Sequence, residues 1–269
     1  MILSDLHVHT VYCDGKSTVD ETVKAALDKN MESVGFSSHE YTAFDTSYCM
    51  SRRKTSEYTR EVQNAKQKYK GKIDIYLGIE RDLYCEKDAE YDYVIGSAHY
   101  IKKDGVYIPV DESAEITENA VKEHFGGSFL KYIRSYFETA AQIPQKTHAD
   151  IIGHFDLVCK FNDKNRYFDE NSKEYKNTAL EALKAAAEKC EILEMNTGAV
   201  SRGCRTDAYP ADFILAGAKE FGMKIILSSD SHDCKNLCFG FDECTNRLKQ
   251  NGFKSVVVLR NGEFTEVGI

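Results

Sequence analysis

The chain has 269 residues, 42% of them hydrophobic, so it is long enough to bury one large core. Its net charge of -8 argues against a protein that coats nucleic acid, because phosphate-backbone binding usually leaves a basic footprint. The first ten residues lack the regions of a signal peptide, and no apolar run is long enough to span a bilayer. We therefore expect one domain over residues 1–269, cytoplasmic, with neither a nucleic-acid nor a membrane partner.

Nine cysteines are spread singly along the chain, and no two of them have the CxxC spacing. Their odd number does not suit a disulfide framework, and their spacing does not match a zinc knuckle. We expect free thiols that act as small buried hydrophobic groups.

Strand-like runs alternate with amphipathic helical segments along the chain. ILSDLHV (2–8) opens with an apolar run, and Thr18 with Glu21 predicts a capping box at the start of a helix. The later predicted strands are SVGFSS (33–38), KIDIYLGIE (72–80), DYVIGSAHY (92–100), ADIIGHFDL (149–157), EILEMN (191–196), KIILSSD (224–230) and SVVVL (255–259). The later predicted helices cover about 55–70, 115–125 and 128–142, a segment capped by Asn171 with Glu174, a segment begun at Pro210, and about 241–250.

This alternation predicts an α/β fold with a parallel sheet. Asp104-Gly105, between two apolar runs, predicts a hairpin turn that interrupts it. About seven or eight βα units follow one another without a linker or repeat, which favours a closed or nearly closed barrel over two domains. An open doubly wound sheet is disfavoured, because no Gly-rich phosphate loop follows an early strand.

Most of the eight histidines lie at or just beyond the C-terminal end of a predicted strand, where a parallel barrel places its active site. The six in this position are His7, His9, His39, His99, His154 and His232. Three carboxylates have equivalent positions, namely Asp14, Glu80 and Asp230. A single histidine at a strand end is more often structural, but six of eight at one kind of position indicate a shared site.

Two of the pairs, His7 with His9 and Asp230 with His232, are two residues apart. On an extended chain such residues point to the same face, so each pair can converge on one metal ion or on adjacent ions. Imidazole and carboxylate ligands without thiolates favour Zn, Mn or Fe over a structural Cys-type zinc site.

The order of these segments resembles the polymerase and histidinol phosphatase (PHP) family. The resemblance lies in DLHVHT followed by Asp14, then SSHE, GIE, GSAHY, IGHFDL, EMNTG and SSDSH, over residues 5–232. It implies a distorted (β/α)7 barrel, TIM-like, with two to three divalent metal ions. The implied ligands are His7, His9, Glu80 and Asp230 for the first ion; Glu80, His99 and His154 for the second; and Asp14, His39 and His232 for the third. Some family members carry a histidine in place of Asp14.

The resemblance also implies a metal-dependent phosphoesterase. The charge of three divalent ions exceeds that of three ligand carboxylates, so the site suits a phosphate dianion. We expect a metal-bridging hydroxide to attack phosphorus in line, with Glu80 and Asp230 as the catalytic carboxylates that orient it.

A shorter stretch bears on the substrate. NTGAVSRGCRTDAYP (196–210) and Lys160, six positions after His154, resemble histidinol-phosphate phosphatases. This implies hydrolysis of L-histidinol phosphate, a small-molecule phosphate monoester, in histidine biosynthesis. Lys160, Arg202 and Arg205 are then candidate phosphate-binding groups, with the surface cation as the alternative for each.

Two kinds of alternative remain open. The nearest is another PHP phosphoesterase, such as a nucleotide phosphatase, an exonuclease or a phosphotyrosine phosphatase. A nuclease would have a basic, aromatic-lined groove, which the overall charge disfavours. The other is a non-catalytic binding module that the metals stabilise. Metal identity and oligomeric state are left open by the sequence.

Overall fold

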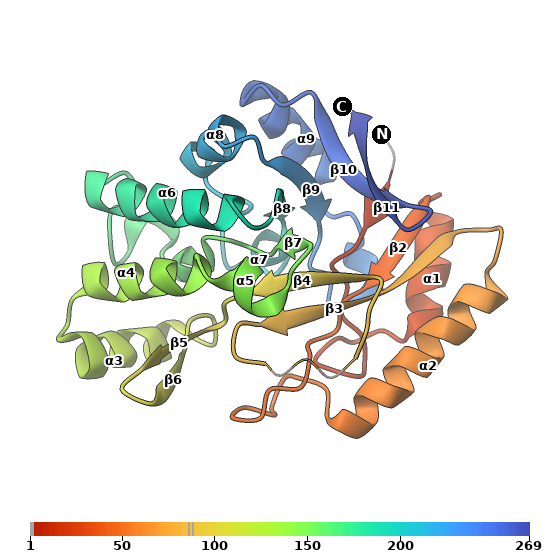
Figure 1. The fold of residues 1–269 in the computed structure, drawn as a ribbon, viewed down its shortest axis with the longest axis horizontal. Coiled ribbons are helices and arrows are strands. Elements are labelled where there is room, and N and C mark those ends of the chain that lie inside the picture. The colour runs from red at the N-terminus through yellow and green to blue at the C-terminus, as the bar shows by residue number, and fades with distance from the viewer. Residues whose placement is uncertain (1–2, 86, 88) are drawn as a thin grey trace.

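The computed structural model describes residues 3–85, 87 and 89–269, which fold around one curled sheet (Figure 1). Its strands are, in chain order, β1 (Ser4–Asp5), β2 (Ser33–Phe36), β3 (Asp74–Asp82), β4 (Tyr93–Ser97), β7 (Ile151–Ile152), β8 (Ile192–Asn196), β9 (Lys224–Ser228), β10 (Ser255–Arg260) and β11 (Glu263–Gly268). A separate hairpin is formed by β5 (Tyr100–Lys103) and β6 (Val106–Pro109), around the predicted Asp104-Gly105 turn.

The strands from β1 to β9 in the main sheet are parallel and lie in the order of the sequence. The sheet then closes on itself, because the chain beyond β1 pairs with the chain beyond β9. Val8 bridges Ser231, the His9 N–H donates to the Ser231 carbonyl at 2.8 Å, and the Ser231 N–H donates to the His7 carbonyl at 3.0 Å. The expected distorted (β/α)7 barrel is confirmed.

Several strands are shorter than predicted. The first predicted strand is reduced to β1, and its initial Ile2 lies outside the described residues. The segment 149–157 contributes only Ile151–Ile152, because the chain turns into a 3-10 helix at Leu157–Cys159. Pairing in a barrel therefore uses the middle of each apolar run and leaves the polar strand ends free to form a site.

The hairpin of β10 and β11 was predicted only in part. β10 pairs with β9 through Val257 and Ile226, whereas β11 was not predicted because its sequence EFTEVG is polar and mostly exposed. Asn261 and Gly262 join the two strands with φ of 50° and 80°, the left-handed geometry that a tight hairpin turn requires.

Helices cover the outside of the sheet: α1 and α2 lie on the right of Figure 1, and α3, α4 and α6 on the left. The α-helices within the described residues are α1 (Val19–Asp28), α2 (Arg52–Lys68), α3 (Ala114–Phe125), α4 (Phe129–Ala140), α5 (Ile143–Thr147), α6 (Lys173–Ala187), α7 (Gly198–Ser201), α8 (Asp212–Glu220) and α9 (Phe241–Gln250). Further 3-10 turns lie at Asp163–Asn165 and Cys234–Asn236. None of the helices formed by these residues combines the length and apolar character needed to cross a membrane.

Two helix starts test the predicted caps. The capping box of Thr18 and Glu21 is present at α1. The predicted Asn171 cap of α6 is wrong by one residue, because the Ser172 side chain accepts the hydrogen bond from the Tyr175 N–H.

All nine cysteines are free thiols, but only Cys49, Cys159, Cys190 and Cys244 are buried, so the expected burial holds for some of them.

The lower part of the barrel interior is apolar. It is filled by Leu6, Tyr76, Tyr93, Ile95, Ile151, Ile192, Ile226, Val257 and Leu259. The Tyr93 ring needs two glycines beside it, since a Cβ at Gly35 would lie 2.3 Å from the Tyr93 hydroxyl and one at Gly78 would lie 2.1 Å from the ring. This apolar plug leaves only the C-terminal end of the barrel open for polar side chains.

Asp5 holds the seam of the barrel together. Its fully buried carboxylate accepts the Ser229 N–H at 3.1 Å, the Ser229 hydroxyl, and the Cys238 N–H at 2.9 Å. Because Ser229 directly precedes Asp230, the same contacts fix the end of β9 beside the start of the chain.

We predict that Asp5→Ala lowers the free energy of unfolding by at least about 3 kcal/mol, because several buried donors lose their acceptor. Urea unfolding followed by circular dichroism measures this loss. Glu181→Ala, at an exposed position on α6, is the control and should change stability by less than about 0.5 kcal/mol. Equal stability of Asp5→Ala and the unaltered protein would contradict the assigned role.

Candidate metal centre

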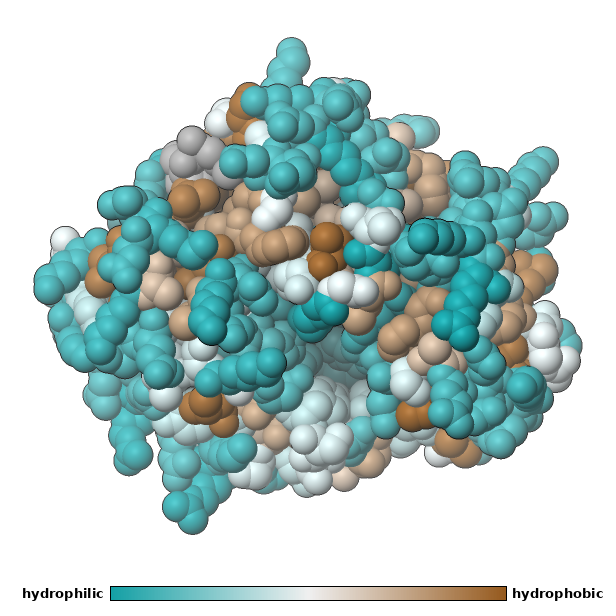
Figure 2. Space-filling view, turned by 180° about the vertical axis from the view of Figure 1, so that it is seen from behind, coloured by the Kyte–Doolittle hydropathy of each residue, from teal (hydrophilic) through white to brown (hydrophobic). Residues whose placement is uncertain are grey.

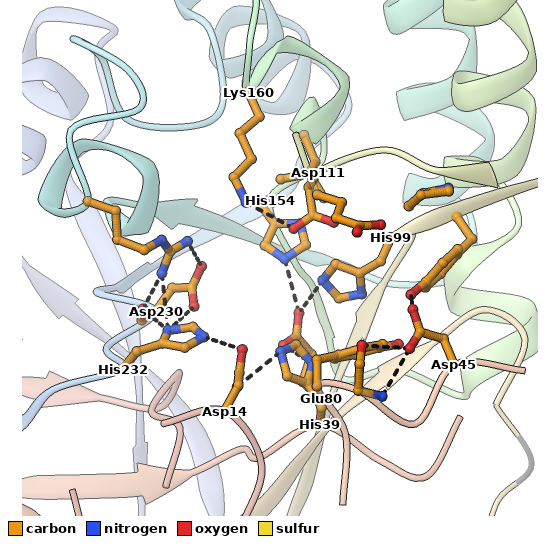
Figure 3. A pocket seen from close by; sticks show the side chains of 17 residues that line it. Asp14, His39, Asp45, Glu80, His99, Asp111, His154, Lys160, Asp230 and His232 are labelled. Carbon is orange, nitrogen blue, oxygen red and sulfur yellow. Dashed lines mark hydrogen bonds and ion pairs between the residues drawn. The ribbon is translucent and has the colours of Figure 1, made fainter. Parts of the chain in front are cut away.

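The nine residues predicted as metal ligands lie together at the C-terminal ends of the barrel strands. Figure 3 shows seven of them around one space: Asp14, His39, Glu80, His99, His154, Asp230 and His232. His7 and His9 complete the set through their contacts with Glu80. The C-terminal ends of parallel strands lie at one end of a barrel, so inward-pointing side chains from these ends come close together.

Glu80, at the end of β3, is the centre of the cluster. Its Oε2 lies 3.1 Å from His7 Nε2, 3.4 Å from His9 Nε2 and 3.0 Å from His39 Nδ1. These four residues are at most 8% exposed. Imidazoles from two different strands therefore converge on one carboxylate oxygen.

The other oxygen of Glu80 faces a second group. Its Oε1 lies 3.0 Å from His154 Nε2 and 3.3 Å from His99 Nε2, and it accepts the Ser97 hydroxyl at 2.6 Å. Each carboxylate oxygen thus has its own set of imidazoles. This is the arrangement expected of a carboxylate that bridges two ions.

A third group lies nearer to solvent. The Nε2 of His232 lies 3.2 Å from Asp14 Oδ2, and the His232 ring stacks on the His9 ring with centroids 4.1 Å apart. Asp230 Oδ1 lies 3.3 Å from His9 Nε2, which connects this group to the buried part of the cluster. The Asp14 side chain is 35% exposed, so this group is at the edge of the site.

The donor set fits divalent metal ions. Buried polar atoms are nearly always hydrogen bonded, yet several here have no hydrogen-bond partner among the described residues. In the cluster, three of these atoms face one another: His7 Nε2, His9 Nε2 and Glu80 Oε2. His99 Nδ1 and His154 Nδ1 also lack such a partner, but these two rings face Glu80 with Nε2. Ligand atoms within 4.8 Å of one another form the groups His9, Asp14, His39 and His232; His7, His9 and Asp230; and His39, Glu80 and His99.

The protonation states suit metal binding in part. Burial opposes protonation of His7 and His99, but Glu194 raises the pKa of His7 and Glu80 raises the pKa of His99 well above the usual range, so a bound ion would displace a proton from each ring. Burial alone would raise the pKa of Glu80, but neighbouring imidazoles, His7 first among them, hold it well below its usual range. Burial likewise opposes ionisation of Asp230, whereas the Arg202 guanidinium keeps the pKa of that carboxyl low. Burial lowers the pKa of His9 to about 3, so its imidazole is neutral at pH 7. Ionised carboxylates and neutral imidazole are the forms that coordinate metals.

A pocket of about 320 Å³ opens over the cluster. It is lined by Asp14, His39, Asp45, Ser47, Tyr48, Glu80, His99, Tyr100, Pro109, Asp111, Glu112, His154, Leu157, Lys160, Arg202, Asp230 and His232. Seen from behind, the molecule is hollowed near its centre, with hydrophilic side chains along the border of the hollow (Figure 2). The cluster is thus accessible to a small molecule.

Comparison with known proteins places this arrangement in a family. The PHP domain model matches residues 5–198, well over half of the chain. The chain belongs to the PHP domain family. A Schizosaccharomyces pombe protein named "Probable histidinol-phosphatase" is 30% identical, covering 77% of this chain and 69% of its own. A Deinococcus radiodurans protein of the same name is 29% identical, covering 94% and 95%.

A solved structure shares the fold of this PHP protein. It is histidinol phosphate phosphatase from Lactococcus lactis, complexed with Zn, L-histidinol and phosphate. The two structures have a TM-score of 0.73 over 98% of each chain, with 21% sequence identity. At this identity the comparison establishes the fold, and the chemistry of the PHP protein has to be argued from its own residues.

Two of the three cations predicted to bind phosphate line the pocket of the PHP protein. Arg202, directly after α7, places Nη2 3.1 Å from Asp230 Oδ2 and donates from Nη1 to the Asp230 carbonyl at 3.0 Å. Lys160 Nζ lies 3.0 Å from Asp111 Oδ2. Both cations therefore line the pocket that opens over the cluster, and Figure 3 shows Lys160 beside Asp111.

Arg205, the third predicted phosphate ligand, is not among the residues that line the pocket. Its guanidinium contacts Glu170 at two points, both 3.1 Å, and donates to the Cys159 carbonyl. These contacts hold the segment between Cys159 and Glu170 and favour a structural role for Arg205, while direct contact with phosphate stays a prediction.

Some residues of the site were not singled out from the sequence. Asp45 and Asp111 line the pocket but lie in irregular segments, where no periodicity indicates the direction of a side chain. Glu194 is fully buried next to His7. A signal for Glu194 was present, because an acidic residue inside the apolar strand EILEMN has to find a buried partner.

We predict that Arg205→Ala lowers the free energy of unfolding by about 2–3 kcal/mol, because Glu170 and the Cys159 carbonyl lose a charged donor. The affinity for inorganic phosphate should change little. Chemical unfolding and isothermal titration calorimetry measure the two effects.

The matched control is Arg166→Ala, which removes an exposed ion pair with Glu118 at 3.3 Å and should cost less than about 1 kcal/mol. Loss of phosphate binding by Arg205→Ala without loss of stability would restore the original prediction.

Proposed function

We propose that this PHP protein is a histidinol-phosphate phosphatase that hydrolyses L-histidinol phosphate to L-histidinol and phosphate. One observation carries the proposal: a single pocket is lined by the metal-ligand cluster, by the cations Lys160 and Arg202, and by a group of acidic and aromatic residues, namely Asp45, Tyr48, Tyr100 and Glu112. The substrate has matching polarity, since it joins an anionic phosphate to a part that bears an ammonium group and an imidazole ring. The names of the two curated relatives agree with this assignment.

The phosphate would bind where the cations meet the cluster. Arg202 has five N–H donors and Lys160 has three, more than their contacts with Asp230 and Asp111 use. A guanidinium can donate to two phosphoryl oxygens at once, which orients the phosphate as well as binding it. We therefore infer that these two residues hold the phosphate in the pocket beside the cluster.

The acidic and aromatic residues of the pocket would receive the cationic part of the substrate. Asp45 accepts the Tyr100 hydroxyl at 2.7 Å and the Ser47 N–H at 3.0 Å. Burial opposes ionisation of Asp45, but the Ser47 hydrogen bonds lower its pKa, so the carboxylate is ionised at pH 7. Tyr48 and Glu112 line the same pocket, and the Tyr48 ring lies 4.8 Å from the His39 ring between centroids. An aromatic face beside a carboxylate favours an ammonium or imidazolium group.

We assign two to three divalent ions, Zn, Mn or Fe, to the three ligand groups described above. His154, whose Nε2 lies 3.0 Å from Glu80 Oε1, completes the group around His99. The Zn in the Lactococcus lactis structure supports this assignment. Divalent ions held here would polarise the phosphoryl group and make water a better nucleophile near neutral pH.

Glu80 and Asp230 are the proposed catalytic carboxylates. Both are buried and ionised, and both face the pocket. An ionised carboxylate can accept a hydrogen bond from the attacking water and hold it in line with the leaving oxygen. Arg202, fixed on Asp230, brings the phosphate to the same point.

We predict that the purified protein contains a divalent metal and hydrolyses L-histidinol phosphate faster than AMP, phosphotyrosine or single-stranded DNA. Removal of the metal with a chelator should abolish the activity. Glu80→Gln should lower kcat/KM on every substrate by about a thousandfold, because the metal contribution to the barrier is several kcal/mol.

Glu138→Gln, at an exposed position on α4, is the matched control and should retain full activity. Faster cleavage of any of the other three substrates would overturn the substrate assignment. Unchanged activity after metal removal would overturn the metal mechanism.

We predict that Asp45→Asn lowers kcat/KM for L-histidinol phosphate about tenfold, mainly through KM, because a charge-assisted contact worth about 1.4 kcal/mol is lost. Asparagine can keep its oxygen toward Ser47 and donate from its amide to the Tyr100 hydroxyl oxygen, so both contacts can be retained. Steady-state kinetics with p-nitrophenyl phosphate, which has no cationic group, should change little.

Asp104→Asn, in the β5–β6 turn, controls for loss of a carboxylate outside the pocket. If Asp45→Asn lowers kcat/KM equally for both substrates, Asp45 does not recognise the cationic part of L-histidinol phosphate.

A further inference from the structure

Glu194, on β8, links three parts of the cluster. Its Oε1 lies 2.6 Å from His7 Nδ1, and its Oε2 accepts the His154 backbone N–H at 2.8 Å. The Asn196 side-chain amide donates to the same Oε2 at 2.9 Å and lies 3.4 Å from Asp230 Oδ2. One carboxylate thus contacts the chain beyond β1 and beyond β7, and reaches the end of β9 through Asn196.

The register of β8 points the Glu194 carboxylate into the barrel. Alternate residues of the strand point into the barrel, and Ile192 belongs to the apolar plug. Glu194 is two residues further on, between the plug and the cluster, and is fully buried. Burying an isolated carboxylate is costly, so the contacts with His7, His154 and Asn196 are needed to keep it there.

The contact with His7 determines which ring nitrogen faces the cluster. An ionised carboxylate accepts a hydrogen bond but cannot donate one, so a neutral His7 carries its proton on Nδ1. Its Nε2 lone pair is then free. That atom has no hydrogen bond within the described chain and lies 3.1 Å from Glu80 Oε2.

We propose that Glu194 is a positioning residue that selects the metal-binding tautomer of His7, fixes His7 relative to His154, and thereby determines how tightly the cluster holds a divalent ion. The inference rests on the proposed metal function, but not on the identity of the substrate. Carboxylates that orient ligand histidines in this way typically contribute about 10- to 100-fold to metal affinity.

Glu194→Gln tests the role with little change of shape. The carboxylate accepts from three donors with two oxygens, whereas the amide has one accepting oxygen and one donor group. If the amide nitrogen faces His7, the ring has to place its proton on Nε2 and loses the ligand atom. If it faces the His154 backbone N–H, the two N–H groups point at each other without an acceptor between them.

The measurement uses Zn²⁺ alone as the probe. Chelator-stripped full-length protein is titrated with Zn²⁺ against a chromophoric chelator. We expect Glu194→Gln to raise the Zn²⁺ dissociation constant about 10- to 100-fold. Glu194→Asp, which keeps both accepting oxygens, should bind Zn²⁺ more tightly than Glu194→Gln. ¹⁵N spectra of histidine-labelled, Zn²⁺-loaded protein should show the His7 resonance displaced in Glu194→Gln.

Leu193→Ala is the matched structural control. Leu193 is on the same strand but packs into the core between sheet and helices, so its loss should lower the unfolding temperature of the stripped protein and leave Zn²⁺ affinity unchanged. The inference is overturned if Glu194→Gln binds Zn²⁺ as tightly as the unaltered protein, or if Leu193→Ala weakens Zn²⁺ binding equally. If L-histidinol phosphate proves not to be the substrate while Glu194→Gln still loses Zn²⁺, only the proposed substrate fails.

Discussion

The site depends on the burial of one carboxylate, Glu80, among five imidazoles. A carboxylate taken out of water without partners would be strongly destabilising or would become protonated. Here imidazole nitrogens lie 3.0 to 3.4 Å from its two oxygens, and the Ser97 hydroxyl donates to one of them. The cost of burial is therefore offset by groups that are themselves suited to bind cations, so a stable barrel and a metal centre use the same residues.

The barrel is organised in layers along its axis, and each layer supports the next. The apolar plug around Tyr93 fills the lower end. Asp5 and Glu194 form a buried polar layer above it, where Asp5 holds the seam between β1 and the end of β9, and Glu194 holds His7. The cluster lies on top, open to the pocket. Each layer draws residues from several strands. The polar layers depend on specific hydrogen-bond partners, so an error in strand register would disturb them more than the apolar plug.

The metal-ligand cluster alone does not select one phosphoester. The lining of the pocket carries both charges: Arg202 and Lys160 contact Asp230 and Asp111, and Asp45 and Glu112 line the same pocket with Tyr48. Such a pocket suits a ligand with a negative and a positive end. A nucleotide or a nucleic-acid strand would bring further negative charge next to Asp45 and Glu112. The net charge of -8 disfavours such ligands as well.

The sequence by itself determined the local features: the capping box at Thr18, the hairpin at Asp104 and the candidate ligands at strand ends, because these depend on residues a few positions apart. Only the tertiary structure decided which side chains far apart in the sequence contact one another. It paired Arg205 with Glu170, turned Asp45 into the pocket, and placed Glu194 against a histidine 187 residues away. The direction of an individual side chain in a loop, and contacts between distant strands, are set by barrel closure, and short-range periodicity carries no information about that closure.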